Sequence, residues 1–441
     1  MSEAAFAVLM LLVLAWAVAS HLLTRVNITG ALVFLAAGYT LGNPTWGLLS
    51  IDVTTPSMHV LAELTLALLL FTDASRVNVA QLRRDVSFPT RLLGIGLPLS
   101  IVLGSLAAAW MFDDFSWALA GFVGATLAPT DAALSAQVIN DDRVPMRLRR
   151  ALNVESGLND GIATPIVAFT LAVVAGDLGL GHHGDSPEVG ALLELALGVG
   201  VGLVIGVGSV ALISLGSRRR WVSTGGRRLA TLGAALASFA LAAALDGNGF
   251  IAAFVAGIAF GARLPADVAE VEEVGELPEL LGELMALAVW FLFGAALLPV
   301  ALDHFSASVL VYALLSLTVI RMIPVGIALL GAGMDRSTVL FVGWFGPRGL
   351  ASVVFILLAV EELGETPLVG QAVSVVAVTV VLSVVLHGVS AGPLGRRYVA
   401  GREAGDDADA PRSRRPGHLH ASDVSRPRAA GSSVVGEDEQ S

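Results

Sequence analysis

Five charged side chains lie within long apolar stretches of the sequence. They are three acids, Asp131, Glu155 and Asp160, and two bases, Arg321 and Arg348. A charge at the centre of a membrane helix costs roughly 2.5–3.5 kcal/mol, so five of them would cost on the order of 15 kcal/mol. That cost is comparable with the stability of a whole domain and requires compensation. Three acids and two bases predict two internal ion pairs and one acid without a basic partner, which is the candidate for function.

Asp160 lies in a segment in which polar residues recur at helical spacing. Glu155 is one turn from Asn159, and Ser156 is one turn from Asp160, so a helix would carry two adjacent polar stripes. Pro165 lacks an N–H group and frees a carbonyl in the preceding turn. A carboxylate, a hydroxyl and a free carbonyl suit a hard cation. The alternative is a structural polar network that joins helices, in which Asp160 would need a partner of its own.

Glycine and proline interrupt two apolar stretches next to charged residues. One interruption lies in residues 124–131 (GATLAPTD) and the other in residues 343–349 (GWFGPRG). Proline in mid-helix breaks the hydrogen-bond ladder, and an adjacent glycine favours local unwinding. The ends of broken membrane helices carry partial charges, so Asp131 can neutralise helix N-termini and Arg348 can neutralise C-termini. The alternative is two proline kinks without a functional role.

Asp73 is a further acid, near the end of an apolar stretch. Its carboxylate could serve an ion path, or it could pair with Arg76, three residues further along a helix. The sequence leaves both interpretations open.

The elements that must position these residues are membrane helices. Of the 441 residues, 55% are hydrophobic and only 14% are charged, whereas soluble domains carry about 25% charged residues. Apolar stretches of about 20 residues recur along the chain and are typical of membrane spans. In lipid the backbone must satisfy its own hydrogen bonds, so these stretches are helices. Strands of an outer-membrane barrel would alternate over about 10 residues. We predict an all-α polytopic membrane protein.

Thirteen helices are predicted, with the two interruptions in spans five and twelve. The arginines between spans lie in or next to the odd-numbered loops, and the sequence contains no lysine. The positive-inside rule makes those loops cytoplasmic, which puts the N-terminus outside and the C-terminus inside. A separation of seven spans is expected if two inverted six-helix repeats flank a linking seventh helix. The predicted spans are 4–23, 30–49, 58–75, 90–112, 116–138, 150–175, 190–214, 228–246, 248–264, 281–302, 306–331, 338–361 and 367–392.

Composition divides the chain into a transmembrane domain, residues 1–400, and a tail, residues 401–441. The tail is rich in Gly, Asp, Ser, Pro and Arg and cannot bury enough apolar surface to fold alone, so we predict a disordered cytoplasmic segment. A regulatory docking role is the alternative. The absence of cysteine excludes disulfides, iron–sulfur clusters and thiolate metal sites. We expect no cofactor and no nucleic-acid partner.

These motifs resemble those of the sodium/proton exchanger superfamily, specifically the NhaP-type prokaryotic antiporters related to animal sodium/proton exchangers. The resemblance covers roughly residues 1–395, and the motifs occur in the family's order. They are ESxxND (Glu155, Ser156, Asn159 and Asp160), APTDA (Ala128–Ala132) and GPRG (Gly346–Gly349).

The resemblance implies a fold in which spans five and twelve cross at their breaks, with a dimerisation domain and a moving core domain. It implies a homodimer in the lipid bilayer of the cell inner (plasma) membrane. Asp131 and Arg348 would lie at the crossing, and Glu155 would pair with Arg321.

The resemblance also implies residue roles in ion binding. Asp160 would bind a cation and a proton in turn, with Thr130 contributing a backbone carbonyl and Ser156 a hydroxyl to Na+. Asp73 matches an acid on the ion path, although family members often carry the longer Glu there. Asn159 in place of a second Asp resembles the electroneutral branch, which moves one proton per cation.

The function implied is secondary active exchange of Na+, with Li+ as a further ion, for H+ in pH homeostasis. A lone buried carboxylate suits exchange because crossing with an uncompensated charge is costly, whereas a protonated or cation-bound state is near neutral. K+/H+ exchange in the same fold is the main alternative. An intramembrane aspartyl protease would need an aspartate in a GxGD setting, which Asp160 lacks, and a cation channel needs no titrating site. We expect a transporter and not an enzyme.

Overall fold

The computed structural model describes residues 3–25, 27–43, 45–49, 56–77, 87–131, 134, 144–180 and 187–409. All regular elements in these ranges are helices, so the predicted all-α fold class is confirmed. Residue contacts divide the chain into Met1–Ala400 and Gly401–Ser441, and the elements described below belong to the first unit unless their bounds extend beyond it.

Each of the thirteen predicted spans overlaps at least one observed helix. The helices, two of which contain a π-helical turn (η), are α1 (Glu3–Arg25), α2 (Gly30–Gly42), α3 (Pro56–Ser75), α5 (Ser87–Arg91), η1 (Leu92–Gly96), α6 (Leu97–Met111), α7 (Trp117–Thr126), α9 (Met146–Asp177), α10 (Pro187–Arg218), α11 (Thr224–Ala244), α12 (Gly249–Arg263), α13 (Val271–Leu292), η3 (Phe293–Leu297), α14 (Leu298–Asp303), α15 (Ala307–Leu317), α16 (Val319–Ala328), α17 (Arg336–Trp344), α18 (Leu350–Leu363) and α19 (Pro367–Asp409).

Three predicted boundaries differ from the structure or fall outside it. Span two was expected to reach residue 49, but α2 ends at Gly42, because Asn43 precedes a proline and takes an extended conformation (ψ 130°). The second half of span five, beyond Asp131, lies outside the described residues except for Leu134. Helix α19 continues through Pro393 to Asp409, and the rest of the predicted tail lies outside the described residues.

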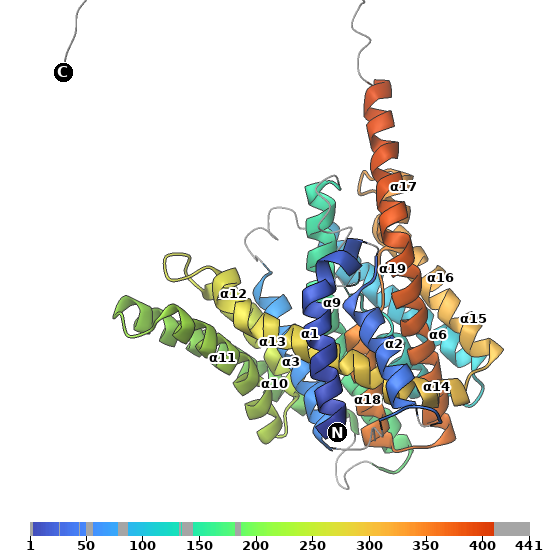
Figure 1. The fold of residues 1–441 in the computed structure, drawn as a ribbon, viewed down its shortest axis with the longest axis horizontal. Helices are drawn as coiled ribbons and strands as arrows, with labels where there is room; N and C mark the ends of the chain where they lie inside the picture. Colours follow the sequence, from blue (N-terminus) through green and yellow to red (C-terminus); the bar gives the residue numbers. More distant parts are fainter. Residues whose placement is uncertain are drawn as a thin grey trace, which may run out of the picture. The chain divides into compact units, whose positions relative to one another are not determined.

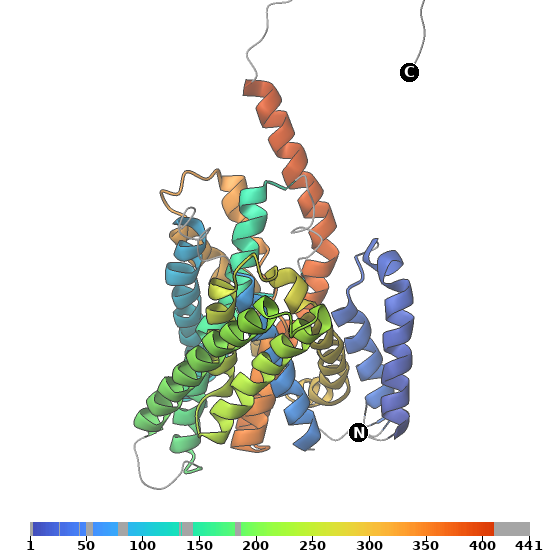
Figure 2. The same cartoon turned by 90° about the vertical axis from the view of Figure 1, so that its left-hand side faces the viewer.

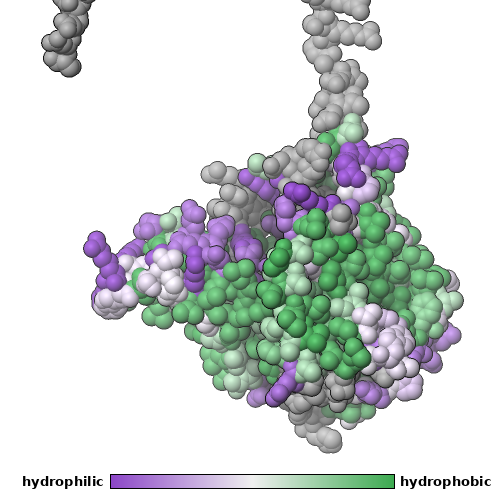
Figure 3. Space-filling view, viewed as in Figure 1, coloured by the Kyte–Doolittle hydropathy of each residue, from purple (hydrophilic) through white to green (hydrophobic). Residues whose placement is uncertain are grey.

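Many of the helices suit a lipid environment. Within the described ranges, eight helical segments are long and apolar enough to cross a membrane, and α2, α7 and α12 are shorter apolar helices. Figure 3 shows an apolar surface across the middle of one face, with hydrophilic residues gathered along its upper and left edges. Helix α1 lies beside α2 at an edge of the bundle (Figures 1 and 2) and exposes large apolar side chains. Those side chains are Phe6, Leu11, Leu14, Val18 and Leu22. Lipid can cover such a surface without the cost that water would impose.

Helix α3 is held at the centre by close approach of its neighbours. It contacts α9, α11, α12, α13 and α18. Gly257 and Gly261 of α12 lie so near to α3 that a Cβ at either position would overlap the carbonyl oxygen of Phe71 or Ser75. Small residues permit this spacing between membrane helices. The close packing fixes the end of α3 that carries Asp73.

The predicted interruptions in spans five and twelve are present, and span eleven contains a third. Helix α7 ends at Thr126, and residues 345–349 separate α17 from α18. The third interruption lies at Thr318, whose φ of −115° and ψ of −88° separate α15 from α16. The sequence does not predict this interruption, because no glycine or proline lies at that position.

Candidate functional site

The two predicted broken spans meet at their interruptions. The Asp131 N–H donates to the carbonyl of Pro347 at 2.8 Å, which joins span five to span twelve. Asp131 Oδ2 accepts from the Leu350 N–H at 3.3 Å, at the first residue of α18. The carboxylate therefore lies at the positive end of a helix dipole, where a negative charge is stabilised.

Arg348 is fully buried and binds backbone carbonyls. Its Nη1 donates to the carbonyls of Ala128 and Pro129, beyond the C-terminal end of α7, and its Nη2 donates to the Ser316 carbonyl at 3.1 Å. Carbonyls at helix C-terminal ends lack partners within the helix. Arg348 therefore binds carbonyls of interrupted spans, as expected for a base that neutralises helix C-termini. Three interrupted helices leave carbonyls that compete for the guanidinium.

Glu155 and Arg321 form a buried ion pair. Arg321 Nη2 lies 2.7 Å from Glu155 Oε1, and both residues are at most 3% exposed. Gly346, from the interruption in span twelve, packs against this pair, since a Cβ there would lie 2.5 Å from Arg321 Nε and 3.0 Å from Thr130 Cγ2. The ion pair therefore packs against the interruption in span twelve, beside Thr130 of span five.

Thr130 is attached to α9 by three hydrogen bonds. Ser156 Oγ donates to the Thr130 carbonyl at 2.7 Å, and Asn159 Nδ2 donates to the same carbonyl at 3.1 Å and to Thr130 Oγ1 at 2.7 Å. Ser156 and Asn159, predicted on adjacent stripes, therefore converge on one residue of the other span. The Asn159 Oδ1 atom is buried and has no hydrogen-bond partner among the described residues.

Asp160 differs from the other buried charges. No described residue forms a hydrogen bond or ion pair with its carboxylate, which is partly buried, while its backbone carbonyl accepts from Thr164 Oγ1 at 2.7 Å. The carboxylates of Asp131 and Asp73 lie near enough to interact with it electrostatically. Helix α9 runs unbroken through Pro165. Asp160 therefore has neither a basic partner nor a hydrogen bond to its carboxylate within the part of the chain that the structure describes.

Asp73 lies beside the same helix. Its Cβ packs on Gly157, where an added Cβ would be 3.6 Å away. The pairing with Arg76 that the sequence left open is not formed, because Arg76 Nη2 instead binds Glu279 of α13. The carboxylates of Asp73, Asp131 and Asp160 thus lie near enough to interact electrostatically with one another.

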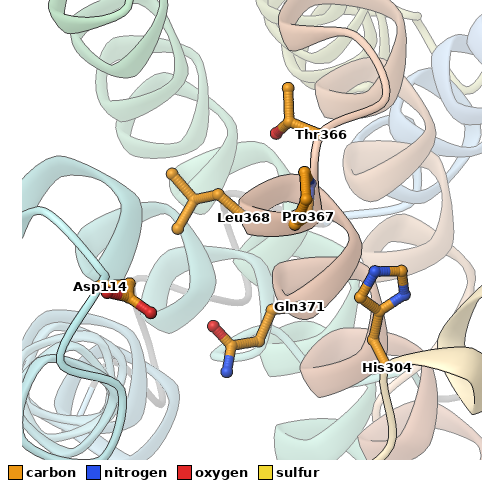
Figure 4. A pocket seen from close by; sticks show the side chains of 6 residues that line it. All are labelled: Asp114, His304, Thr366, Pro367, Leu368 and Gln371. Carbon is orange, nitrogen blue, oxygen red and sulfur yellow. The ribbon is translucent and has the colours of Figure 1, made fainter.

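A separate cavity of about 500 Å³ lies away from these residues. It is formed by the α6–α7 loop, the end of α14 and the start of α19, and none of the site residues lines it (Figure 4). Its lining residues are Asp114, His304, Thr366, Pro367, Leu368 and Gln371. This cavity is therefore distinct from the polar site at which spans five and twelve meet.

Interrupted membrane helices whose ends meet beside ionisable groups are typical of secondary transporters. The model of one family, described as "Sodium/hydrogen exchanger, transmembrane", matches residues 8–397. The chain belongs to this family and is a multi-pass membrane protein.

Individual relatives agree with this family. The chain is 30% identical over 369 residues to the Na(+)/H(+) antiporter NhaP of Pseudomonas aeruginosa, which covers 78% of this chain and 82% of the relative. It is 26% identical over 401 residues to the K(+)/H(+) antiporter NhaP of Alkalimonas amylolytica, covering 89% of this chain and 67% of the relative. The solved structure of the sodium proton antiporter MjNhaP1 from Methanocaldococcus jannaschii matches the fold with a TM-score of 0.72 at 18% identity, over 90% of this chain and 98% of that chain. The predicted family is confirmed.

The packing at the point where spans five and twelve meet leaves no room for a side chain at Gly349. A Cβ there would overlap the carboxylate of Asp131, although the extended backbone (φ −127°) would accept any residue. We expect Gly349→Ala to displace Asp131 from the α18 N-terminus, to lower the stability by about 1–3 kcal/mol and to remove most exchange activity. Thermal unfolding in detergent and exchange in proteoliposomes measure both effects.

Gly343→Ala is the matched control. Gly343 lies within α17, and a Cβ there would be 3.4 Å from Met322 Cγ, an ordinary van der Waals distance. Equal loss of activity in the two variants would contradict a specific requirement for space at Asp131.

Proposed function

We propose that this protein is a secondary active antiporter, and not an enzyme, that exchanges Na+ for H+ across the inner (plasma) membrane. The observation that carries the proposal is the contrast among the buried charges. Glu155 is paired with Arg321, Arg348 is bound to carbonyls and Asp131 caps a helix, whereas Asp160 has no such partner among the described residues. A carboxylate in that position can be neutralised by a proton or by a cation.

The groups around Asp160 fit a hard monovalent cation. The proposed ligands are the Asp160 carboxylate, Ser156 Oγ and the Thr130 carbonyl. The last two oxygens are 2.7 Å apart and belong to different spans. Asn159 supplies a buried amide oxygen that lacks a partner within the described ranges. Carboxylate, hydroxyl and carbonyl oxygens are ligands that hard cations prefer.

Exchange follows from competition for one charged group. The charge-bearing carboxylate is costly to move through the membrane unless a proton or Na+ neutralises it. The remaining charges of the crossing already have partners, so the net charge of the site changes mainly with the occupant of Asp160. If the site opens alternately to the two sides of the membrane, the movement of Na+ in one direction is coupled to the movement of H+ in the other. Asp73, on the neighbouring helix, would serve the ion path to this site.

The neutral Asn159 beside Asp160 supports an electroneutral exchange of one proton per cation. We further propose a homodimer, with the N-terminus outside and the C-terminus inside. Light scattering of the purified protein measures the oligomeric state, and labelling of introduced cysteines measures the orientation.

Cation selectivity is tested in proteoliposomes that carry an inward-acid pH gradient. We expect Na+ and Li+ to dissipate the gradient and equimolar K+ to leave it unchanged. Dissipation by K+ alone would replace the cation assignment with K+/H+ exchange, the activity named for the Alkalimonas relative. Absence of dissipation by all three cations would contradict antiport itself.

A further inference from the structure

The interruption in span twelve leaves two backbone groups that face α19. The Trp344 carbonyl, at the end of α17, closes a tight turn with the Gly346 N–H at 2.8 Å. The Arg348 N–H lies just before α18 and belongs to no helical ladder. The Arg348 N–H is in the protein interior, where an unpaired backbone group costs about 1–3 kcal/mol.

Two side chains of α19, one helical turn apart, meet both groups. Ser383 Oγ lies 2.6 Å from the Arg348 N, and His387 Nε2 lies 2.9 Å from the Trp344 carbonyl oxygen. The two side chains also meet each other, with 3.2 Å between Ser383 Oγ and His387 Nδ1. Ser383 and His387 are at most 1% exposed, so water does not substitute for them.

The two backbone groups fix the direction of their own hydrogen bonds. The Arg348 N–H can only donate, so Ser383 Oγ accepts from it. The Trp344 carbonyl can only accept, so His387 carries its hydrogen on Nε2. His387 Nδ1 lies 2.9 Å from the Ser383 carbonyl oxygen and 3.2 Å from Ser383 Oγ, so it faces its own helix. A ring that carries a hydrogen on Nε2 therefore binds one side of the interruption, and Ser383 binds the other.

The Trp344 ring also packs on the His387 imidazole, with 5.2 Å between the ring centroids. This contact adds to the hydrogen bond between His387 and the Trp344 carbonyl.

We propose that Ser383 and His387 clamp the interruption in span twelve and thereby position the cation site. The clamp fixes the backbone on both sides of Pro347, whose carbonyl binds the Asp131 N–H. It also fixes the start of the Arg348 side chain, which holds the carbonyls of Ala128 and Pro129 next to Thr130. Ser383 and His387 are positioning residues, since neither is a proposed ligand of the cation. Their effect on cation binding rests on the proposed function, but the clamp itself does not.

The clamp is tested first without transport, by hydrogen–deuterium exchange of the full-length protein in detergent. Ser383→Ala removes the acceptor of the Arg348 N–H, and we expect that amide to exchange roughly tenfold faster. Ser390→Ala is the matched control, because Ser390 lies on the same helix and its one hydrogen bond within the described ranges is from the Trp344 side chain, Nε1 to Oγ at 2.9 Å. Equal exchange at Arg348 in both variants and in the unmodified protein would overturn the clamp.

The positioning role is tested by Na+-driven exchange in proteoliposomes. His387→Leu should raise the half-saturating Na+ concentration roughly tenfold and leave the rate at saturating Na+ near that of Ser390→Ala. His387→Gln keeps an N–H donor near the Nε2 position and should restore most of the Na+ affinity. A merely structural role would lower the amount of active protein in His387→Leu without changing the half-saturating concentration, and that result would overturn the positioning role.

The two tests separate the clamp from the proposed function. If the unmodified protein shows no exchange with any cation, the proposed function fails, and the deuterium measurement at Arg348 still decides whether the clamp exists.

Discussion

Asp160→Asn should abolish Na+-driven proton movement in proteoliposomes, to the level of vesicles without protein. The substitution removes the carboxylate that has no hydrogen-bond or ion-pair partner within the described residues. Asparagine keeps the size of the side chain but can neither carry the proton nor neutralise a cation. The measurement is the recovery of an internal pH dye after a Na+ pulse, at matched protein content and with folding checked by thermal unfolding.

Asp177→Asn is the control for this variant. Asp177 ends the same helix and is exposed, so the same chemical change there should leave exchange close to the unmodified rate. Exchange retained in Asp160→Asn at a comparable rate would remove the basis of the proposed mechanism.

Arg321→Gln should cause the largest loss of stability. Removal of the guanidinium leaves the Glu155 carboxylate buried without its partner at 2.7 Å. An uncompensated buried charge costs about 3–5 kcal/mol. The double variant with Glu155→Gln removes both charges and should recover most of that loss. Denaturant unfolding in detergent, followed by tryptophan fluorescence, measures the free energies of the single and double variants.

The control for this experiment is an ion pair at the surface. Arg227 Nη2 lies 3.1 Å from Glu273 Oε1, and these side chains are 18% and 37% exposed. Arg227→Gln should cost less than about 1 kcal/mol, because solvent screens such pairs. If Arg321→Gln were no more destabilising than Arg227→Gln, or if the double variant were as unstable as the single one, the structural role of the buried pair would be contradicted.

The helices were predictable because lipid restricts what the backbone can do. A long apolar stretch in a membrane has to be a helix, and every predicted span overlaps one. The interruptions at Pro129 and Pro347 were predictable because proline removes a donor, although proline alone does not decide the outcome, since α9 runs unbroken through Pro165. The interruption at Thr318 was not, since it contains no such residue, and its backbone conformation depends on packing that the local sequence does not specify.

The site was predictable in its residue types but not in its pairings. A count of side-chain charges predicts two ion pairs without naming the partners, and it leaves out the backbone carbonyls that the interruptions free and that surround Arg348 in the structure. The convergence of Ser156 and Asn159 on Thr130 depends on how two spans pack. His387 was missed because a single histidine in an apolar stretch has no local signature.

In the proposed mechanism, Na+ and H+ compete for one carboxyl group, that of Asp160. The most direct test is the half-saturating Na+ concentration for exchange in proteoliposomes, measured across a series of pH values. Where the carboxyl group is mostly protonated, each Na+ bound releases one proton, so this concentration should increase about tenfold for each unit by which the pH falls. The rate at saturating Na+ should change much less. A half-saturating concentration that does not change with pH would contradict competition for a single site.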